Sequence, residues 1–390
     1  MLNASLSAPP ELSAPRVLET FEHGLIGTAI RRSPLVASDL AALSTPGTAL
    51  VSSAIHRDPE LFERYSWAPR LVAVVSDGSA VLGLGDIGPR ACLPVLETKC
   101  VFFKKIADLD AIPLVFSDRR IDAIVAALAA LRPSFGAVSI EDVAAPGCFE
   151  LERRLRDALD CPVMHNDQHG TAVAVVASLR NAALLTGRDF AAMRVVILGA
   201  GAAGIATARL LATAGLPDLT LVDTRGIVDA RRRDLHAAKR EVSTYTNARG
   251  LTGGIEEALR GADALVGLSR ATVPGTLLAG MRPEPIILSL ANPVPEVLQE
   301  AARSVGAVYA TGRATAPNCV TNLLTVPGIF HGALSAGAAQ ITPGMLLAAV
   351  DGLVRASLPI LDADHLVPDA LDPAVFSHIS AAVGAAAPVS

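Results

Sequence analysis

A glycine-rich segment in the second half of the chain limits the possible folds more than any other feature. The apolar run 194–198 leads directly into GAGAAG at 199–204, and a long apolar stretch with helical character follows. A further apolar run, 219–222, ends at Asp223. This succession of strand, glycine turn, helix, strand and acidic residue is typical of a Rossmann βαβ unit. The sequence therefore predicts a domain that binds a dinucleotide such as NAD.

Each glycine of this turn has its own physical task. Gly199 permits the tight turn, Gly201 lets backbone N–H groups approach the pyrophosphate, and Gly204 lets the helix pack against the strand. Ala202 and Ala203 lie between them at the start of the helix, where we expect them to line the cofactor. A larger side chain at any of the glycines would obstruct one of these contacts.

Asp223 bears on the choice of cofactor. A carboxylate at the end of the second strand can accept hydrogen bonds from the ribose hydroxyls, and it would repel the extra phosphate of NADP. This favours NAD, although the nearby Arg225 weakens the preference and leaves NADP as the alternative. A helix cap or turn residue is the competing interpretation of Asp223.

Length and periodicity predict the rest of the architecture. A chain of 390 residues is long for a single hydrophobic core, which indicates two domains. Strand-like and helix-like runs alternate between residues 110 and 165, as in a parallel α/β sheet. We therefore expect an α/β fold in which residues 1–160 form a small substrate and metal domain with parallel strands. Residues 161–390 are expected to form a Rossmann-type domain that ends in a helical tail.

Two local patterns predict further features. Asp77-Gly78 stands between the apolar runs 71–75 and 80–84, which predicts a β-hairpin. The first sixty residues are interrupted by many prolines, which suits an arm or an oligomer contact more than a core.

Composition and charge exclude several classes of protein. A net charge of −5 provides no basic surface for nucleic acid. No uncharged apolar run is long enough to span a membrane, and the N-terminus lacks the pattern of a signal peptide, so we expect a cytoplasmic protein. The five cysteines are scattered without the paired spacing of zinc or redox sites, which indicates reduced structural thiols.

Carboxylates follow two of the predicted parallel strands. Glu141 and Asp142 come after the run 135–140, and Asp167 follows the run 162–164. The carboxyl ends of parallel strands form the edge of a sheet where ligands bind. Three oxygen donors without nearby cysteine suit a hard cation such as Mg²⁺ or Mn²⁺. The competing interpretation is that these carboxylates are helix caps.

Several segments taken together resemble one family, the short bacterial malic enzymes. The similarity covers roughly residues 35 to 340, and the order of the segments is specific. The segments are VAVVSDGSAVLGLGDIG at 72–88, Lys99, IED at 140–142, HNDQHGT at 165–171, GAGAAG at 199–204, SLANPVPE at 289–296, PNCVTN at 317–322 and PGIF at 327–330.

The resemblance implies an activity and a set of partners. Malic enzymes oxidise malate with NAD(P), decarboxylate the resulting oxaloacetate on a divalent metal, and protonate the enolate to release pyruvate. The expectation is therefore metal-dependent oxidative decarboxylation of malate or a malate-like 2-hydroxy acid. The cofactors would be NAD, or NADP, together with Mg²⁺ or Mn²⁺, and the assembly a homodimer.

The resemblance also implies a role for individual residues. By position, Lys99 matches the general base of the family, and Glu141, Asp142 and Asp167 match its metal ligands. The matched substrate contacts are Asn292 and Asn322, and the residues expected beside the cofactor include Thr171 and Asn292. As a base Lys99 must be neutral, which needs a pKa well below about 10.4 and is plausible beside a metal ion. Without the resemblance, Lys99 would be interpreted as a solvated helix lysine.

The sequence departs from the family at the position of a catalytic tyrosine, which aligns with Ser44. A serine hydroxyl is shorter and a poor acid, so the final protonation is expected to differ. We interpret Tyr65 as structural and not as a substitute. Asn166 stands where the family has an aspartate, which removes one negative charge near Lys99 and the metal.

These departures leave three hypotheses. The first is oxidative decarboxylation of malate or a related acid. The second is a metal-dependent 2-hydroxy acid dehydrogenase that stops at the keto acid, since hydride transfer does not need the missing tyrosine. The third is a catalytically inactive homologue that still binds NAD(P).

Overall fold

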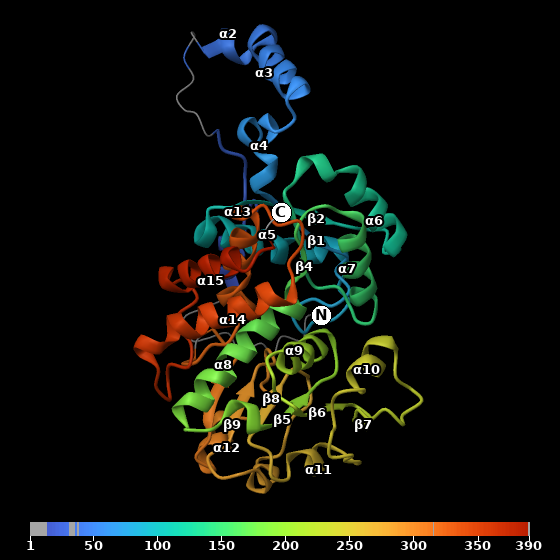
Figure 1. Cartoon of the computed structure of the whole chain (residues 1–390), viewed down its shortest axis with the longest axis vertical. Helices are drawn as coiled ribbons and strands as arrows, with labels where there is room; N and C mark the ends of the chain where they lie inside the picture. Colours follow the sequence, from blue (N-terminus) through green and yellow to red (C-terminus); the bar gives the residue numbers. More distant parts are fainter. Residues whose placement is uncertain (1–13, 31–35, 37–38, 315, 389–390) are drawn as a thin grey trace.

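The computed structural model describes residues 14–30, 36, 39–314 and 316–388. Two lobes, each built on its own sheet, lie one above the other along the long axis of the molecule (Figure 1). A helical arm near the N-terminus projects beyond the upper lobe. The fold class expected from the sequence is confirmed, because a parallel α/β unit is followed by a Rossmann-type unit with a helical tail.

The upper lobe contains a four-stranded parallel sheet in the order β2-β1-β3-β4. Its central strand, LVAVVS, is buried along its whole length, as β-branched residues in a doubly covered sheet should be. Alternate residues of this strand enter different cores, one under α5 and one under α6 and α7. The elements are β1 (Leu71–Ser76), α5 (Gly88–Ala107), β2 (Asp110–Val115), α6 (Ile121–Ala130), β3 (Ala137–Ile140), α7 (Gly147–Ala158) and β4 (Val163–His165).

The predicted hairpin around Asp77-Gly78 is wrong. β1 pairs in parallel with β2 and β3, and residues 80–84 form no strand. Short polar side chains turn the chain locally instead, because Ser76 Oγ accepts the N–H of Gly78 and Asp77 Oδ1 accepts the N–H of Ser79, both at 3.0 Å. The loop then runs to the start of α5.

The lower lobe contains a six-stranded sheet in the order β10-β9-β8-β5-β6-β7. All neighbours are parallel except β6 and β7, so the sheet is mixed at one edge. The elements are α8 (Thr171–Leu185), β5 (Arg194–Leu198), α9 (Ala202–Thr213), β6 (Asp218–Asp223), β7 (Gly226–Ile227), α10 (Ala237–Val242), α11 (Ile255–Leu259), β8 (Ala264–Gly267), β9 (Ile286–Ser289), α12 (Gln299–Ser304) and β10 (Val308–Thr311).

The C-terminal helices join the two lobes. They are α13 (Val326–Ser335), α14 (Pro343–Ser357) and α15 (Pro373–Ala385). α13 packs against α5 of the upper lobe, where Phe103 and Phe330 meet edge to face with ring centroids 5.4 Å apart. α14 packs against both α15 and α8. One hydrophobic core therefore runs from the upper sheet into the tail.

Among the described residues, the segment Pro343–Ile360 is the one helix long and apolar enough to cross a membrane. Of this segment, 44% is buried inside the protein. Asp351 forms an ion pair with Arg180 of α8, with Oδ1 and Nη1 2.6 Å apart. One face of this helix lies in the hydrophobic core of the molecule, and the face that carries Asp351 is exposed.

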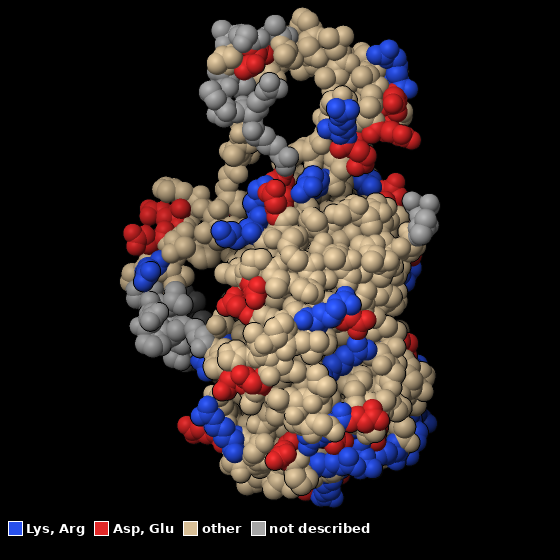
Figure 2. Space-filling model, turned by 60° about the vertical axis from the view of Figure 1, so that its left-hand side comes forward, with Lys and Arg blue, Asp and Glu red and all other residues tan. Residues whose placement is uncertain are grey.

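The N-terminal arm carries apolar side chains that the rest of the chain does not cover. Its elements are α2 (Asp39–Leu43), α3 (Thr45–Arg57) and α4 (Leu61–Tyr65). α1 (Ala14–Thr20) leads instead to Leu25, whose backbone N–H donates to Glu97 of α5 at 2.8 Å. None of the residues of α3 is buried, and Leu40 and Leu50 are 65% and 73% exposed. Figure 2 shows the arm standing out from the body, with acidic and basic side chains interspersed on the lobes below it.

The glycine turn allows a test of the packing between β5 and α9. A Cβ atom at Gly204 would clash with the backbone carbonyl oxygen of Gly199, whereas a Cβ at Gly201 would meet no atom within 4 Å. We therefore expect Gly204→Ala to lower the free energy of unfolding by about 3 kcal/mol, as overpacking does. Gly201→Ala is the matched control and should keep the wild-type stability in urea unfolding. Equal stability of the two variants would contradict this account of the turn.

Candidate active site

A cavity of about 940 Å³ lies between the two lobes. It is lined by residues that follow the carboxyl ends of strands in both sheets, together with one side of α5. The sequence-predicted residues along its wall are Lys99, Asp142, Asp167, Thr171, Gly201, Ala202, Ala203, Asn292 and Asn322. Residues that are far apart in the sequence and were predicted to share a site therefore lie around one cavity.

The carboxylates meet because β3 and β4 are parallel neighbours. Glu141 and Asp142 directly follow β3, and Asp167 lies in the π-helical turn Asn166–Gly170 that follows β4. The backbone N–H of Asp142 donates to Asp167 Oδ2 at 2.9 Å. Asp142 has a φ of +53°, in the left-handed region that non-glycine residues rarely adopt, and such backbone is often found at functional sites.

Glu141 is fully buried behind the cavity wall and is held by neutral and charged donors. Ser139 Oγ donates to it at 2.8 Å, and Asn166 Nδ2 donates to both carboxylate oxygens at 2.8 and 2.9 Å. Burial raises the pKa of Glu141, Lys99 opposes that change, and Asp167 reinforces it. An aspartate at position 166 would repel Glu141, so the asparagine found there stabilises this arrangement.

Asp142 has the chemistry of a metal ligand. Burial, with Asp167 and Glu141 nearby, raises the pKa of Asp142 to about 8. Within the described part of the chain, Asp142 Oδ2 and Asn166 Oδ1 are both buried without a hydrogen-bond partner. Buried oxygens normally have a partner, and oxygen donors at a polar cavity suit a hard divalent cation. The donor chemistry therefore fits Mg²⁺ or Mn²⁺.

The ligands are not gathered around one point in this structure. Across residues 14–30, 36, 39–314 and 316–388, no three His, Cys, Asp or Glu side chains are arranged to hold a metal ion. Glu141 instead faces its hydrogen-bond donors and Lys99. Asp142, Asn166 and Asp167 line the cavity, whereas Glu141 does not.

Lys99 projects from α5 and joins the two lobes electrostatically. Its Nζ lies 3.4 Å from Glu141 Oε2 and 3.4 Å from Asn322 Oδ1. Burial would lower the pKa of Lys99, but Glu141, Asp167 and Asp142 outweigh it, so the pKa is raised. The charges of the protein alone therefore do not produce the lowered pKa that a general base needs. A cation bound to the same carboxylates would cancel the negative charge that raises the pKa of Lys99.

Comparison with known proteins decides the family. Residues 33–156 match the family profile described as "Malic enzyme, N-terminal domain", and residues 168–386 match "Malic enzyme, NAD binding domain". The chain belongs to the malic enzyme family. The two profiles together span most of the chain. The first covers β1 to β3 of the upper sheet, and the second covers the whole lower sheet.

Individual relatives and structures agree with this assignment. A bifunctional malic/malolactic enzyme of Bacillus subtilis strain 168 is 42% identical over 355 residues, which is 90% of this chain and 87% of that protein. An NADP-dependent malic enzyme of Halomonas elongata is 37% identical over 387 residues, covering 93% and 90%. The crystal structure of an NAD-dependent malic enzyme from Thermotoga maritima superposes with a TM-score of 0.91 at 40% identity, covering 96% and 100%.

In this malic enzyme, Asp223 lies at the end of β6 with its hydrogen-bonding capacity largely used. Arg232 donates to its two oxygens at 2.9 and 3.1 Å, Lys239 Nζ lies 2.6 Å from Oδ2, and the N–H of Arg225 lies 2.9 Å from Oδ1. Burial would raise the pKa of Asp223, but Arg232 and Lys239 hold it below its ordinary value. A ribose hydroxyl would have to compete with these donors, which weakens the expected preference for NAD.

Ser44 and Tyr65 both lie in the arm. Ser44 precedes α3 and Tyr65 ends α4, and neither lines the cavity. The remaining tyrosines, Tyr245 and Tyr309, do not line it either. Within a single chain, no tyrosine therefore borders the cavity, and the serine aligned with the family's catalytic tyrosine is remote from Lys99.

Three other residues near the cavities were missed from the sequence. Glu296 accepts hydrogen bonds from the N–H groups of Ser269 and Ala291 at 2.8 and 3.1 Å, which ties together two loops of the cofactor side. Arg270 is a second cation that lines the same cavity as Lys99. Glu152 contacts the turn that carries Asp167 from behind. The SLANPVPE segment could have pointed to Glu296, whereas no motif marks the other two.

The raised pKa of Asp142 predicts a pH dependence of the metal-free protein. The folded protein keeps a proton that the unfolded chain releases, so stability falls as the pH rises from 3.8, the ordinary value, to about 8. Asp142→Asn removes that titration, and asparagine tolerates the left-handed backbone. At pH 8 in a chelator, the variant should be more stable than the wild type by on the order of 2 kcal/mol.

Urea unfolding at several pH values checks this expectation. The advantage of Asp142→Asn should shrink steadily as the pH is lowered from 8 towards 5. An equal difference between the two proteins at every pH would show that Asp142 is not the titrating group.

Proposed function

We propose that this chain oxidatively decarboxylates malate, or a malate-like 2-hydroxy acid, with transfer of hydride to NAD or NADP. The observation that carries the proposal is one cavity that brings together the carboxylates, Lys99 and the glycine turn. It is supported by family membership and by relatives that are named as NAD- and NADP-dependent malic enzymes. Substrate would bind between the metal side and the cofactor side.

The metal would be held by Asp142 and Asp167, with Glu141 as the third carboxylate and Asn166 contributing its free amide oxygen. Bound there, a divalent cation would supply Lewis-acid stabilisation of negative charge on substrate oxygens. In this structure Glu141 is engaged by Asn166 and Lys99, so it would have to exchange one of these contacts to act as a ligand.

Lys99 is the proposed general base. Its neutral Nζ would take the proton of the substrate hydroxyl while the hydride leaves the adjacent carbon for the nicotinamide. Asn322 and Glu141, each 3.4 Å from Nζ, fix the side chain on either side. Loss of carbon dioxide then leaves an enolate, whose carbon must be protonated. Asn322 and Asn292 are the proposed substrate contacts on the Rossmann side.

The cofactor would bind over the glycine turn. Gly199 and Gly204 shape the turn, and Gly201, Ala202 and Ala203 face the cavity. Thr171 and Asn292 line the same cavity and are the proposed nicotinamide-side contacts. Because Asp223 is already engaged by Arg232 and Lys239, both NAD and NADP belong to the proposal.

A homodimer and a cytoplasmic location complete the proposal. The division expected after residue 160 is not where the two sheets divide, because β4 (Val163–His165) pairs with β3 of the upper sheet. The exposed apolar side chains of α2 and α3 would be covered by a second copy. Sedimentation of the full chain tests this point, since a monomer at micromolar concentration would contradict it.

A second function is favoured by one observation. No tyrosine lines the cavity, and Ser44 lies in the arm, so the acid that protonates the enolate is missing from a single chain. The alternative is therefore a dehydrogenase that stops at the keto acid. A third possibility, an inactive homologue, would bind NAD(P) without turnover.

One assay separates these functions. Purified protein is mixed with Mn²⁺, L-malate and NAD or NADP, and the absorbance of NAD(P)H is recorded together with released carbon dioxide. Matched formation of both products is the expected result. Reduced cofactor without carbon dioxide would indicate the dehydrogenase, and cofactor binding without any product would indicate the inactive homologue.

Lys99→Met tests the proposed base. Removing the amine should lower kcat by about 10³-fold, as expected for loss of general-base catalysis, while NAD(P) affinity stays unchanged. Lys105→Met is the control, because Lys105 lies exposed on the same helix. Turnover by Lys99→Met at the rate of the control would exclude Lys99 as the base.

A further inference from the structure

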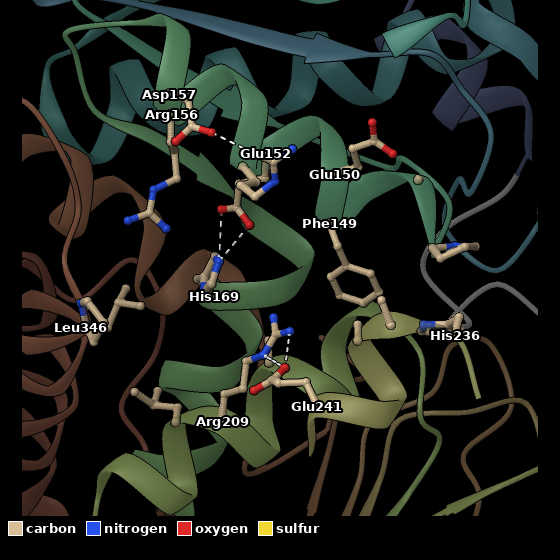
Figure 3. A pocket seen from close by; sticks show the side chains of 18 of the residues that line it. Phe149, Glu150, Glu152, Arg156, Asp157, His169, Arg209, His236, Glu241 and Leu346 are labelled. Atoms are coloured by element: carbon tan, nitrogen blue, oxygen red, sulfur yellow. Dashed lines mark hydrogen bonds and ion pairs between the residues drawn. The ribbon is translucent and has the colours of Figure 1, made fainter. Parts of the chain in front are cut away.

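A second cavity lies on the far side of the Asp167 turn. It measures about 950 Å³ and is lined by α7 of the upper lobe and by α9, α10 and α14 of the lower lobe and tail (Figure 3). Glu152 and His169 face each other within it. The sequence predicted no site here.

Glu152 makes three contacts with the segment that follows α7. Its Oε1 accepts the backbone N–H of His165 at 2.9 Å. The same carboxylate pairs with Nε2 of His169, at 2.9 Å from Oε1 and 3.0 Å from Oε2. Figure 3 shows Glu152 pointing from its helix towards the His169 ring. One side chain therefore contacts both ends of the segment 165–169.

Two of the three residues between these contacts line the other cavity. His165 ends β4 and His169 belongs to the π-helical turn, whereas Asn166 and Asp167 line the cavity that contains Lys99. Glu152 thus holds from behind the turn whose front carries a proposed metal ligand. A π-helical turn is a rare conformation that is frequent at functional sites.

The environment of Glu152 keeps its carboxylate ionised although the residue is buried. The residue is 6% exposed, and burial alone would raise its pKa. Interaction with His169 and the hydrogen bond from His165 outweigh burial and lower the pKa of Glu152 to about 2. The carboxylate is therefore ionised at neutral pH. A buried ionised carboxylate tolerates little displacement from its donors.

The second cavity borders one end of the turn. Open space lies beside the His169 side chain, which remains 18% exposed, whereas Asn166, Gln168 and Gly170 are buried. Glu152 is therefore the polar contact that fixes the end of the turn on the side of the second cavity. Catalytic groups lose much of their effect when displaced by about 1 Å.

We propose that Glu152 is a positioning residue that holds the Asn166–Asp167 turn in place for the divalent metal by anchoring it at His165 and His169. The inference rests on the proposed function, because it concerns the metal side of that site. Glu152 itself touches neither the cavity that contains Lys99 nor any group that would react.

The test compares Glu152→Ala and Glu152→Gln with a matched control, Glu150→Gln. Glu150 lies on the same helix and lines the same second cavity, but its carboxylate approaches Arg154, at 3.8 Å, and makes no contact with the turn. Binding of Mn²⁺ to the full chain is measured directly from the electron paramagnetic resonance signal of the free ion. The KM for malate, kcat and NAD(P) affinity are measured alongside.

Glu152→Ala should weaken Mn²⁺ binding by about 10-fold or more, the usual effect of losing a residue that orients a metal ligand. Glu152→Gln keeps an acceptor for the His165 N–H and should lose less, so that the conservative variant partly restores binding. Glu150→Gln should bind as the wild type does, and NAD(P) affinity should be unchanged in all variants.

Two results would overturn the inference. Wild-type Mn²⁺ affinity in both Glu152 variants would do so, even if thermal unfolding showed a loss of stability, because a purely structural role predicts that result. If Glu152→Ala does not fold, Glu152→Gln decides alone. Absence of Mn²⁺ binding to the wild-type chain would instead contradict the proposed function, and with it this inference.

Discussion

The structure depends on how one sheet edge accommodates buried negative charge. Glu141 is fully buried and Asp142 nearly so, and Asp167 arrives beside them from the neighbouring strand. Buried carboxylates are costly unless they are paired, hydrogen-bonded or protonated. The ion pair of Glu141 with Lys99, its hydrogen bond from Asn166 and the protonation favoured by the raised pKa of Asp142 each offset part of this free-energy cost. A bound divalent cation would offset the rest, so the stability of this sheet edge and its proposed chemistry depend on the same ion.

The two lobes place this edge opposite the cofactor site. Parallel strands in each sheet end at the same cavity, so the carboxylates of one sheet and the glycine turn of the other share a wall. The tail secures this arrangement, because α13 packs against α5 through Phe103 and Phe330. Asn322, just before α13, reaches Lys99 on α5 and connects the two lobes at the site itself.

Periodicity and motifs predicted the features that depend on residues close together in the sequence. Runs of apolar residues predicted the parallel strands. Asp142 and Asp167 were predicted as ligands because they follow strand ends and match the family motifs. Long-range geometry was not predictable. Asp77 accepts a hydrogen bond from Ser79 and does not begin a hairpin. Ser44 lies in the arm and not at the cavity. Glu152 contacts His165, which lies thirteen residues away in the sequence, and no motif indicates that contact. The raised pKa of Lys99 in the metal-free protein was not predictable either, because it depends on three carboxylates that come together only in the fold.

The central claim is that the buried carboxylate edge binds a divalent cation beside Lys99. The most direct measurement is a crystal structure with Mn²⁺ and malate, in which anomalous scattering locates the ion. The account predicts one strong peak per chain, in contact with oxygens of Asp142 and Asp167, and the malate hydroxyl within hydrogen-bond distance of Lys99 Nζ. A peak elsewhere, or ordered malate without an ion at these carboxylates, would contradict it.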